Sequence, residues 1–209
     1  MSTHGCGYVA RQASLAVGLA LAFIASPALA QSAERPEVKV GDEWQFVTYL
    51  GVPPSKPNIV WVVTSITPAG IEGTENGKPL MLTQDLNVAE SPLFRFSERR
   101  LLSFPLEVGR KWTVRNNVYD KSLEAKRIED LNVTVVGRER VRVLAGEFDA
   151  FKIEAKGKAG VEGAAGAGGR EISYTYWYAP SARAIVKQET ADRYHGPSAM
   201  ELVSLKLLP

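Results

Sequence analysis

Segments in which apolar and polar residues alternate recur along most of this chain. The clearest is 148–156, where Phe151, Ile153 and Ala155 fall on one face and Lys152 and Glu154 on the other. A period of two is typical of a half-buried β-strand. Similar patterns predict strands at 43–50, 80–86, 93–97, 111–119, 131–136, 138–143, 171–179, 183–189 and 201–207. Residues 59–66 are apolar on both faces, which predicts a strand that is covered on both sides.

Turn residues separate these segments, as at Pro68-Ala69-Gly70 and Asn76-Gly77. Residues 121–130 form the one segment that predicts a short helix, or else an irregular crossing. Frequent short strands with glycine- and proline-containing turns are typical of antiparallel proteins. We therefore expect an all-β fold: an antiparallel curved sheet, a half-barrel or sandwich of about ten strands, with at most one short helix.

The first thirty residues have the order of a secretory signal peptide. Arg11 precedes an apolar run at 13–25, and Ala28-Leu29-Ala30 offers a small-residue cleavage site before Gln31. The apolar run is shorter than a membrane-spanning helix requires. We expect residues 1–30 to be removed and 31–209 to form one β domain in the periplasm or outside the cell, not spanning the membrane after cleavage.

Composition excludes several function classes. Cys6 is the only cysteine and falls in the predicted signal, so the mature chain has no disulfide, thiolate nucleophile or cysteine metal site. The chain carries 25 Lys and Arg against 23 Asp and Glu. This near balance gives no electrostatic reason to expect a nucleic acid partner.

Two unusual segments have structural interpretations. Residues 157–170 are rich in glycine but lack a phosphate-binding pattern, so we expect a flexible loop between two hairpin strands. The pattern Val-Gly-x-x-Trp occurs at 40–44 and again at 108–112. It indicates either a duplicated half-domain or a repeated local turn in which glycine permits positive φ, with the second interpretation favoured.

Catalytic patterns are scarce. His195 is the only histidine beyond the predicted signal, and no Gly-x-Ser-x-Gly nucleophile motif occurs. We expect no metal and no cofactor. Asp42, Glu43, Glu147 and Asp149 are carboxylates that a glycan hydrolase could use if two converged in a cleft. Their positions at strand entries and turns are also those of ordinary solvent-facing residues.

Aromatic residues give the one positive signal for binding. Tyr174, Tyr176 and Tyr178 alternate along one predicted strand and share a face, and Trp61 lies in another strand. Such residues line cavities for apolar ligands, although they also serve ordinary core packing. We take Trp61, Tyr174, Tyr176 and Tyr178 as candidate ligand-binding residues.

Four motifs carry a resemblance to a known group of proteins. They are VGDEW at 40–44, PLEVGRKW at 105–112, AGEFDAFKI at 145–153 and TYWYAP at 175–180. In their order and spacing, the chain resembles small Gram-negative periplasmic proteins of unknown function. The resemblance implies an antiparallel β-sheet domain, reminiscent of the half-barrel of periplasmic lipoprotein carriers, and supplies no catalytic residues.

These observations predict a secreted or periplasmic, non-enzymatic domain that binds a lipid or other apolar ligand. Two alternatives stay open at this stage. One is a carboxylate-dependent envelope hydrolase, and the other is a structural subunit that binds a protein partner of an envelope complex through an exposed sheet edge.

Overall fold

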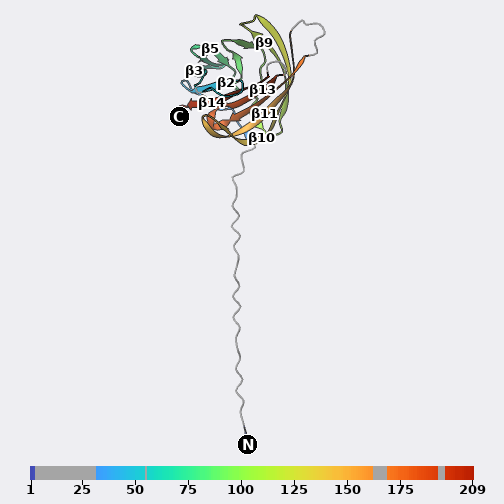
Figure 1. The fold of residues 1–209 in the computed structure, drawn as a ribbon. Coiled ribbons are helices and arrows are strands. Elements are labelled where there is room, and N and C mark those ends of the chain that lie inside the picture. The colour runs from blue at the N-terminus through green and yellow to red at the C-terminus, as the bar shows by residue number, and fades with distance from the viewer. Residues whose placement is uncertain (3–31, 55, 162–168, 193–195) are drawn as a thin grey trace.

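The chain folds into a closed antiparallel β-barrel (Figure 1). The computed structural model describes residues 1–2, 32–54, 56–161, 169–192 and 196–209. Residues 3–30 of the predicted signal peptide and His195 therefore lie outside the described residues. In chain order the barrel strands are β2 (Glu43–Tyr49), β3 (Ile59–Thr67), β4 (Gly70–Glu75), β5 (Lys78–Leu82), β6 (Val88–Glu90), β7 (Phe94–Phe96), β9 (Lys111–Asp120), β10 (Ala125–Val143), β11 (Gly146–Val161), β12 (Arg170–Ala179), β13 (Ala184–Asp192) and β14 (Gly196–Lys206).

The all-β antiparallel prediction is confirmed, but the half-barrel is wrong because the sheet closes on itself. Strand β14 pairs with β2, and β7 pairs with β9, which in turn pairs with β10. Two further short strands, β1 (Ser32–Ala33) and β8 (Leu106–Glu107), pair with each other outside this ring. The twelve barrel strands therefore leave no free edge in their sheet.

The helix predicted at 121–130 is also wrong. The side chain of Asp120 accepts hydrogen bonds from the backbone N–H groups of Ser122 and Leu123, which makes a tight turn. Strand β10 begins directly afterwards. The one helical element among the described residues is a single 3₁₀ turn, η1 (Pro180–Ala182).

The structure differs from two other local predictions. The strands predicted on either side of Gly137 are one strand, β10, with a β-bulge between Val135 and Gly137. Strands β11 and β12 also take in both ends of the glycine-rich segment. Gly157 belongs to β11, where a Cβ atom would lie only 1.9 Å from the carbonyl oxygen of Asp130. This glycine therefore permits close approach of β10, and residues 162–168 lie outside the described residues.

The repeated Val-Gly-x-x-Trp pattern forms the same turn twice. Gly41 and Gly109 both have positive φ, at 94° and 91°. Their N–H groups donate to the carbonyl oxygens of Val63 and Val135, each on the neighbouring strand. Each turn also follows a short strand and opens a run of six barrel strands, β2–β7 or β9–β14. This arrangement favours the duplicated half-domain over an isolated local turn.

A buried carboxylate fixes the end of the barrel where β2 begins. Asp42 is fully buried and accepts hydrogen bonds from the backbone N–H of Lys39 at 3.0 Å and of Leu208 at 2.8 Å. The guanidinium of Arg183 lies 3.0 Å from the same side chain. Asp42 therefore joins the start of β2 to Arg183, which precedes β13, and to Leu208, which follows β14.

The seam between β6 and β7 is the shortest in the barrel. These strands are paired only at Glu90 and Arg95. The Arg95 guanidinium lies 3.2 Å and the Lys121 ammonium 2.7 Å from the Glu90 carboxylate. Hydrogen bonds from these two cations lower the pKa of Glu90 to about 2. Ion pairs of Glu90 with Arg95 and Lys121 therefore stabilise the junction of β6 and β7, where few backbone hydrogen bonds form.

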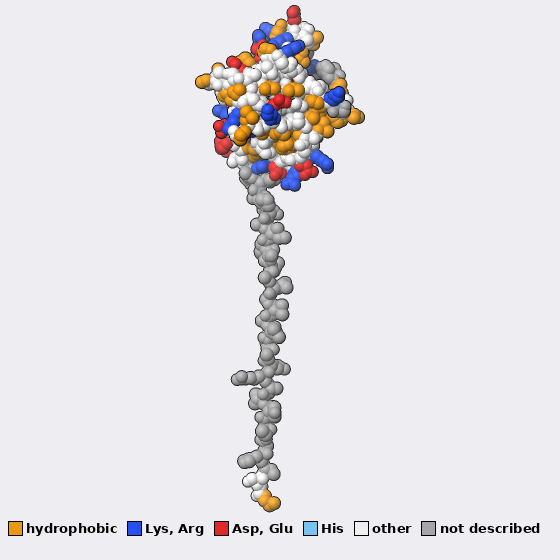
Figure 2. Space-filling model, turned by 90° about the vertical axis from the view of Figure 1, so that its left-hand side faces the viewer, with side chains coloured by type: hydrophobic (Ala, Val, Ile, Leu, Met, Phe, Trp, Pro, Cys, Tyr) orange, Lys and Arg blue, Asp and Glu red, His pale blue; other side chains and the backbone are white. Residues whose placement is uncertain are grey.

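The surface mixes charge and apolar groups. Figure 2 shows Lys and Arg side chains interspersed with Asp and Glu on the face in view, with hydrophobic side chains between them. The described part of this face therefore carries no large field of one sign, in keeping with the balanced composition.

Replacing Asp42 by Ala is expected to destabilise the protein by about 3 kcal/mol, because two backbone donors and a largely buried guanidinium lose their acceptor. Asp149→Ala is the matched control, since its partner Arg140 is 70% exposed and the pair lies on the surface. That change is expected to cost no more than about 1 kcal/mol. Urea unfolding of the purified variants measures both, and equal losses would contradict the assigned role of Asp42.

The Glu90 cluster makes a pH-dependent contribution to stability. Because the folded pKa is depressed, this contribution is fully present above the unfolded pKa of about 4.5 and is lost as pH falls toward 2. Glu90→Gln is therefore expected to lose about 1 kcal/mol or less at neutral pH and nothing near pH 2. Unfolding of wild type and variant across this range tests it, with Glu154→Gln as control. A difference that does not change with pH would contradict the assignment.

Candidate functional site

The inside of the barrel contains two adjoining cavities. The first, here the tryptophan cavity, has a volume of about 390 Å³. The second, here the tyrosine cavity, has a volume of about 550 Å³. Five residues line both cavities and form the boundary between them: Phe94, Phe96, Arg99, Leu101 and Gln188.

Strand register builds the tryptophan cavity. Trp44 pairs with Trp61 and Phe46 pairs with Ile59, so all four side chains leave β2 and β3 on the same face. The Trp61 and Phe46 rings meet edge to face with centroids 5.2 Å apart. The other lining residues are Thr48, Glu75, Leu82, Leu86, Asn87, Val88, Ser91, Leu93, Leu102, Arg183, Ala184, Ile185 and Met200.

The indole nitrogens of this cavity are already satisfied. Trp44 Nε1 donates to the carbonyl oxygen of Ala182 at 2.8 Å, and Trp61 Nε1 donates to Glu75 Oε2 at 3.0 Å. A buried tryptophan normally needs such a partner for its N–H. The ring carbons are therefore the surfaces that remain for contact with an apolar molecule.

The tyrosine cavity is more polar and is organised around Glu129. This buried carboxylate accepts hydrogen bonds from the Tyr174 hydroxyl at 3.1 Å and from Asn116 Nδ2 at 3.2 Å. The guanidinium of Arg127 lies 3.3 Å from the same carboxylate. Burial, followed by the charge of Glu129, raises the pKa of Tyr174 above its usual value. Tyr174 is therefore neutral and donates to Glu129 throughout the ordinary pH range.

An arginine stands at the boundary of the two cavities. The Arg99 guanidinium carbon lies 4.5 Å from the centroid of the Phe96 ring, within the range of a cation–π contact. In the described part of the chain, Arg99 forms no ion pair. Arg127 makes a similar contact with Phe94 at 5.5 Å, but its charge is compensated by Glu129.

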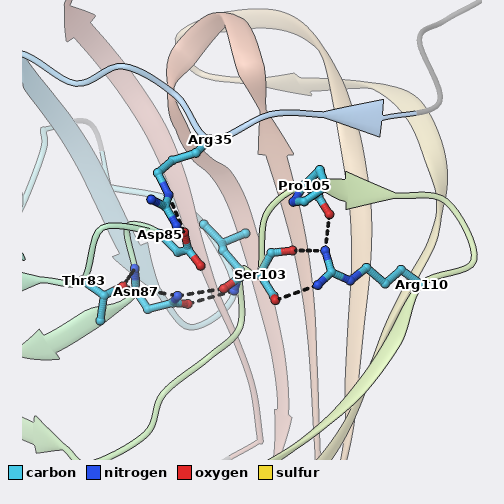
Figure 3. Close-up of polar contacts among 8 residues, drawn as sticks. Arg35, Thr83, Asp85, Asn87, Ser103, Pro105 and Arg110 are labelled. Carbon is cyan, nitrogen blue, oxygen red and sulfur yellow. Dashed lines mark hydrogen bonds and ion pairs between the residues drawn. The ribbon is translucent and has the colours of Figure 1, made fainter.

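Arg99 belongs to an inner segment, residues 97–105, that inserts Leu101 and Leu102 into the core. Asn87 holds this segment: its Oδ1 accepts from the N–H groups of Leu101 and Leu102, both at 2.8 Å. Arg110 donates to the carbonyl oxygens of Ser103 and Pro105, as Figure 3 shows. Side chains thus replace the hydrogen bonds that a sheet would supply to this backbone.

The structure divides the four candidate binding residues. Trp61 lines the tryptophan cavity, and Tyr174 and Tyr176 line the tyrosine cavity. Tyr178 lines neither: it is fully buried, and its ring meets Phe104 edge to face with centroids 5.2 Å apart. Tyr178 keeps the same register on β12 as Tyr176 and belongs to the same buried cluster, so it serves core packing.

Sequence reasoning missed the boundary residues. The pattern Phe94-Arg95-Phe96 alternates in the sequence and points both phenylalanines to one face, which was the available signal. Arg99 lies between strands and carried no comparable signal, because only the folded inner segment directs it toward the cavities.

The four candidate carboxylates do not meet at a cavity. Asp42 is occupied by the contacts described above, and Glu43 accepts a hydrogen bond from Gln45 at 2.7 Å. Asp149 lies 3.4 Å from Arg140, and Glu147 is exposed opposite Arg142 on the neighbouring strand. The tryptophan and tyrosine cavities include none of these four side chains in their lining.

Two features are absent from the described residues. They contain no group of three or more His, Cys, Asp or Glu side chains placed to hold a metal ion. They also contain no helix with the length and apolar character needed to cross a membrane.

Comparison with known proteins extends the fold assignment. The sequence matches no protein-family model and no curated protein. Among solved structures, it is similar to a protein of Bacteroides fragilis described as exported and as having a YmcC-like fold. That similarity has 17% identity and a TM-score of 0.55, and it covers 83% of this chain and 99% of the other.

Two proteins described as lipoproteins are also similar in structure. One, from Parabacteroides distasonis, has 15% identity and a TM-score of 0.50, with 83% of this chain and 98% of the other covered. The other, YmcC of Escherichia coli, has 10% identity and a TM-score of 0.49, with 80% and 85% covered. At these identities the comparisons show that the chain shares a fold with the first two proteins.

Proposed function

We propose that this protein is an exported, non-enzymatic binding protein that holds a lipid or other apolar ligand inside its barrel. The observation that carries the proposal is the pair of adjoining cavities within the ring of strands. Trp61 contacts the ligand in one cavity, and Tyr174 and Tyr176 contact it in the other.

The size and chemistry of the cavities support this role. Volumes of about 390 and 550 Å³ fall within the usual range of small-molecule sites, about 300–1,000 Å³. Aromatic and aliphatic side chains form most of the tryptophan cavity, with a few polar groups among them. Leu50, which is 69% exposed, lines the tyrosine cavity, so this cavity reaches the surface at the end of β2.

Two independent observations support export. The first thirty residues have the charge, apolar run and small-residue site of a secretory signal. The structures that share the fold are described as an exported protein and a lipoprotein. An exported carrier of apolar molecules would need an interior lined by apolar side chains, which the tryptophan cavity supplies.

Barrel closure also bears on the two alternatives. A hydrolase needs two carboxylates converging on a substrate, and the four candidates contact other groups or face solvent. A subunit that docks through a sheet edge needs unpaired backbone groups, and the twelve barrel strands have none of their edges free. The lumen is therefore the favoured binding element.

Native mass spectrometry of protein purified without detergent, before and after extraction with organic solvent, tests the proposal. We expect an additional mass that extraction removes, after which titration with dodecanol changes tryptophan fluorescence through Trp44 and Trp61. Ala184→Trp places a large side chain in the tryptophan cavity and is expected to weaken dodecanol binding at least about tenfold.

Ala191→Trp is the matched control, because Ala191 lies on the same strand, is exposed and lines neither lumen cavity. It is expected to bind dodecanol as the wild type does. A ligand-free mass together with no fluorescence change on titration would overturn the proposal, as would equal weakening in the two variants.

A further inference from the structure

We propose that the ligand is an anionic amphiphile whose charged group binds Arg99 and whose apolar chain occupies the tryptophan cavity. This inference rests on the proposed function and specifies the chemical class of ligand. The observation behind it is the positive charge of Arg99, which has no ion-pair partner among the described residues and lies at the boundary of the two cavities.

Arg99 lies where three cavities meet. It lines the tryptophan cavity, the tyrosine cavity and a third, more polar cavity of about 480 Å³. Its side chain is half-buried, lies over the face of Phe96 and is a close neighbour of the Tyr176 hydroxyl. A partly desolvated guanidinium without a counterion is unfavourable, and a carboxylate or phosphate can compensate it through two parallel hydrogen bonds.

The other arginines at the cavities are already engaged. Arg127 lies 3.3 Å from Glu129, and Arg183 lies 3.0 Å from Asp42. Arg170 also has an interaction partner. Arg99 therefore differs from its neighbours in having its positive charge available to a ligand.

A second group beside Arg99 can bind the same anion. Tyr176 is 1% exposed and lines the tyrosine cavity, yet its hydroxyl has no hydrogen-bond partner among the described residues. Burial raises the pKa of Tyr176 well above its usual value, and the positive charge of Arg99 opposes that rise. The hydroxyl is therefore a neutral donor close to the guanidinium, and a ligand oxygen would satisfy both groups.

The polarity of the cavities orients the molecule. Beyond Arg99, the tryptophan cavity is lined mainly by aromatic and aliphatic side chains, including Trp44, Phe46 and Met200. Glu75 also lines this cavity, where it accepts a hydrogen bond from the Trp61 indole and would repel an anion. An apolar chain is thus favoured in the tryptophan cavity and the anionic group at its boundary with the tyrosine cavity.

Binding of four probes with the same chain tests the charge preference, each below its micelle concentration. The probes are dodecanoate, dodecyl phosphate, dodecanol and dodecyltrimethylammonium. Wild-type protein is expected to bind at least one of the two anions about tenfold or more tightly than dodecanol, because a charge-assisted hydrogen bond is gained. The cationic probe is expected to bind more weakly than dodecanol, and the tighter anion identifies the headgroup.

Arg99→Gln is expected to bind anion and alcohol equally, whereas Arg99→Lys keeps a reduced preference for the anion. Arg100→Gln is the matched control: it removes the same charge from the adjacent residue, which lines neither lumen cavity. It should retain the full preference. Circular dichroism verifies folding of each variant.

The outcomes separate this inference from the proposed function. If wild-type protein binds dodecanol and the anions equally, or if Arg99→Gln keeps the preference, the Arg99 site is overturned while lumen binding stands. If no probe binds the wild-type protein, both proposals fail.

Discussion

The width of a closed twelve-stranded barrel is the constraint on which the rest of this structure depends. Barrel diameter grows with strand number, and about eight strands already enclose an interior that side chains just fill. Wall residues alone therefore cannot fill this interior. Large aromatic side chains such as Tyr178 and Phe151, together with Leu101 and Leu102 of the inner segment, occupy part of it. The volume that they leave is the pair of cavities.

The two halves of the barrel begin with turns that make related contacts. Asp42 and Arg110 occupy equivalent positions in the two Val-Gly-x-x-Trp turns. Asp42 binds the backbone of the segment that follows β14, at Leu208. Arg110 binds the backbone of the segment that follows β7, at Ser103. Each turn thus binds the backbone of the segment that leaves the last strand of the other half. A carboxylate makes the contact in one turn, and a guanidinium makes it in the other.

The segment that follows β7 also shapes the candidate site. It carries Arg99 and Leu101 to the boundary of both cavities before β8 begins. The boundary between the cavities therefore depends on the path of this segment.

Local patterns predicted much of the wall and little of the closure. Alternation correctly placed Tyr174 and Tyr176 on one face, because side-chain direction along a strand follows from position alone. The helix at 121–130 failed because the Asp120 side chain makes a turn that an apolar pattern does not reveal. Barrel closure depends on pairing between β6 and β7; the alternation at 93–97 predicted β7, but the three residues of β6 are too few for a periodic signal. The role of Arg99 depends on the path of the inner segment, which only tertiary contacts determine.

The four tryptophans of the chain offer the most direct test that the lumen is a ligand site. The Trp44 and Trp61 rings line the tryptophan cavity, whereas Trp177 lies between Lys152 and Lys187 with its indole nitrogen 2.7 Å from Glu139. Two-dimensional NMR of the indole N–H groups during titration with dodecanoate reports on these environments separately. The account predicts that the Trp44 and Trp61 signals shift and saturate while the Trp177 signal stays in place. A shift of Trp177 alone, or no shift of any indole signal, would contradict it.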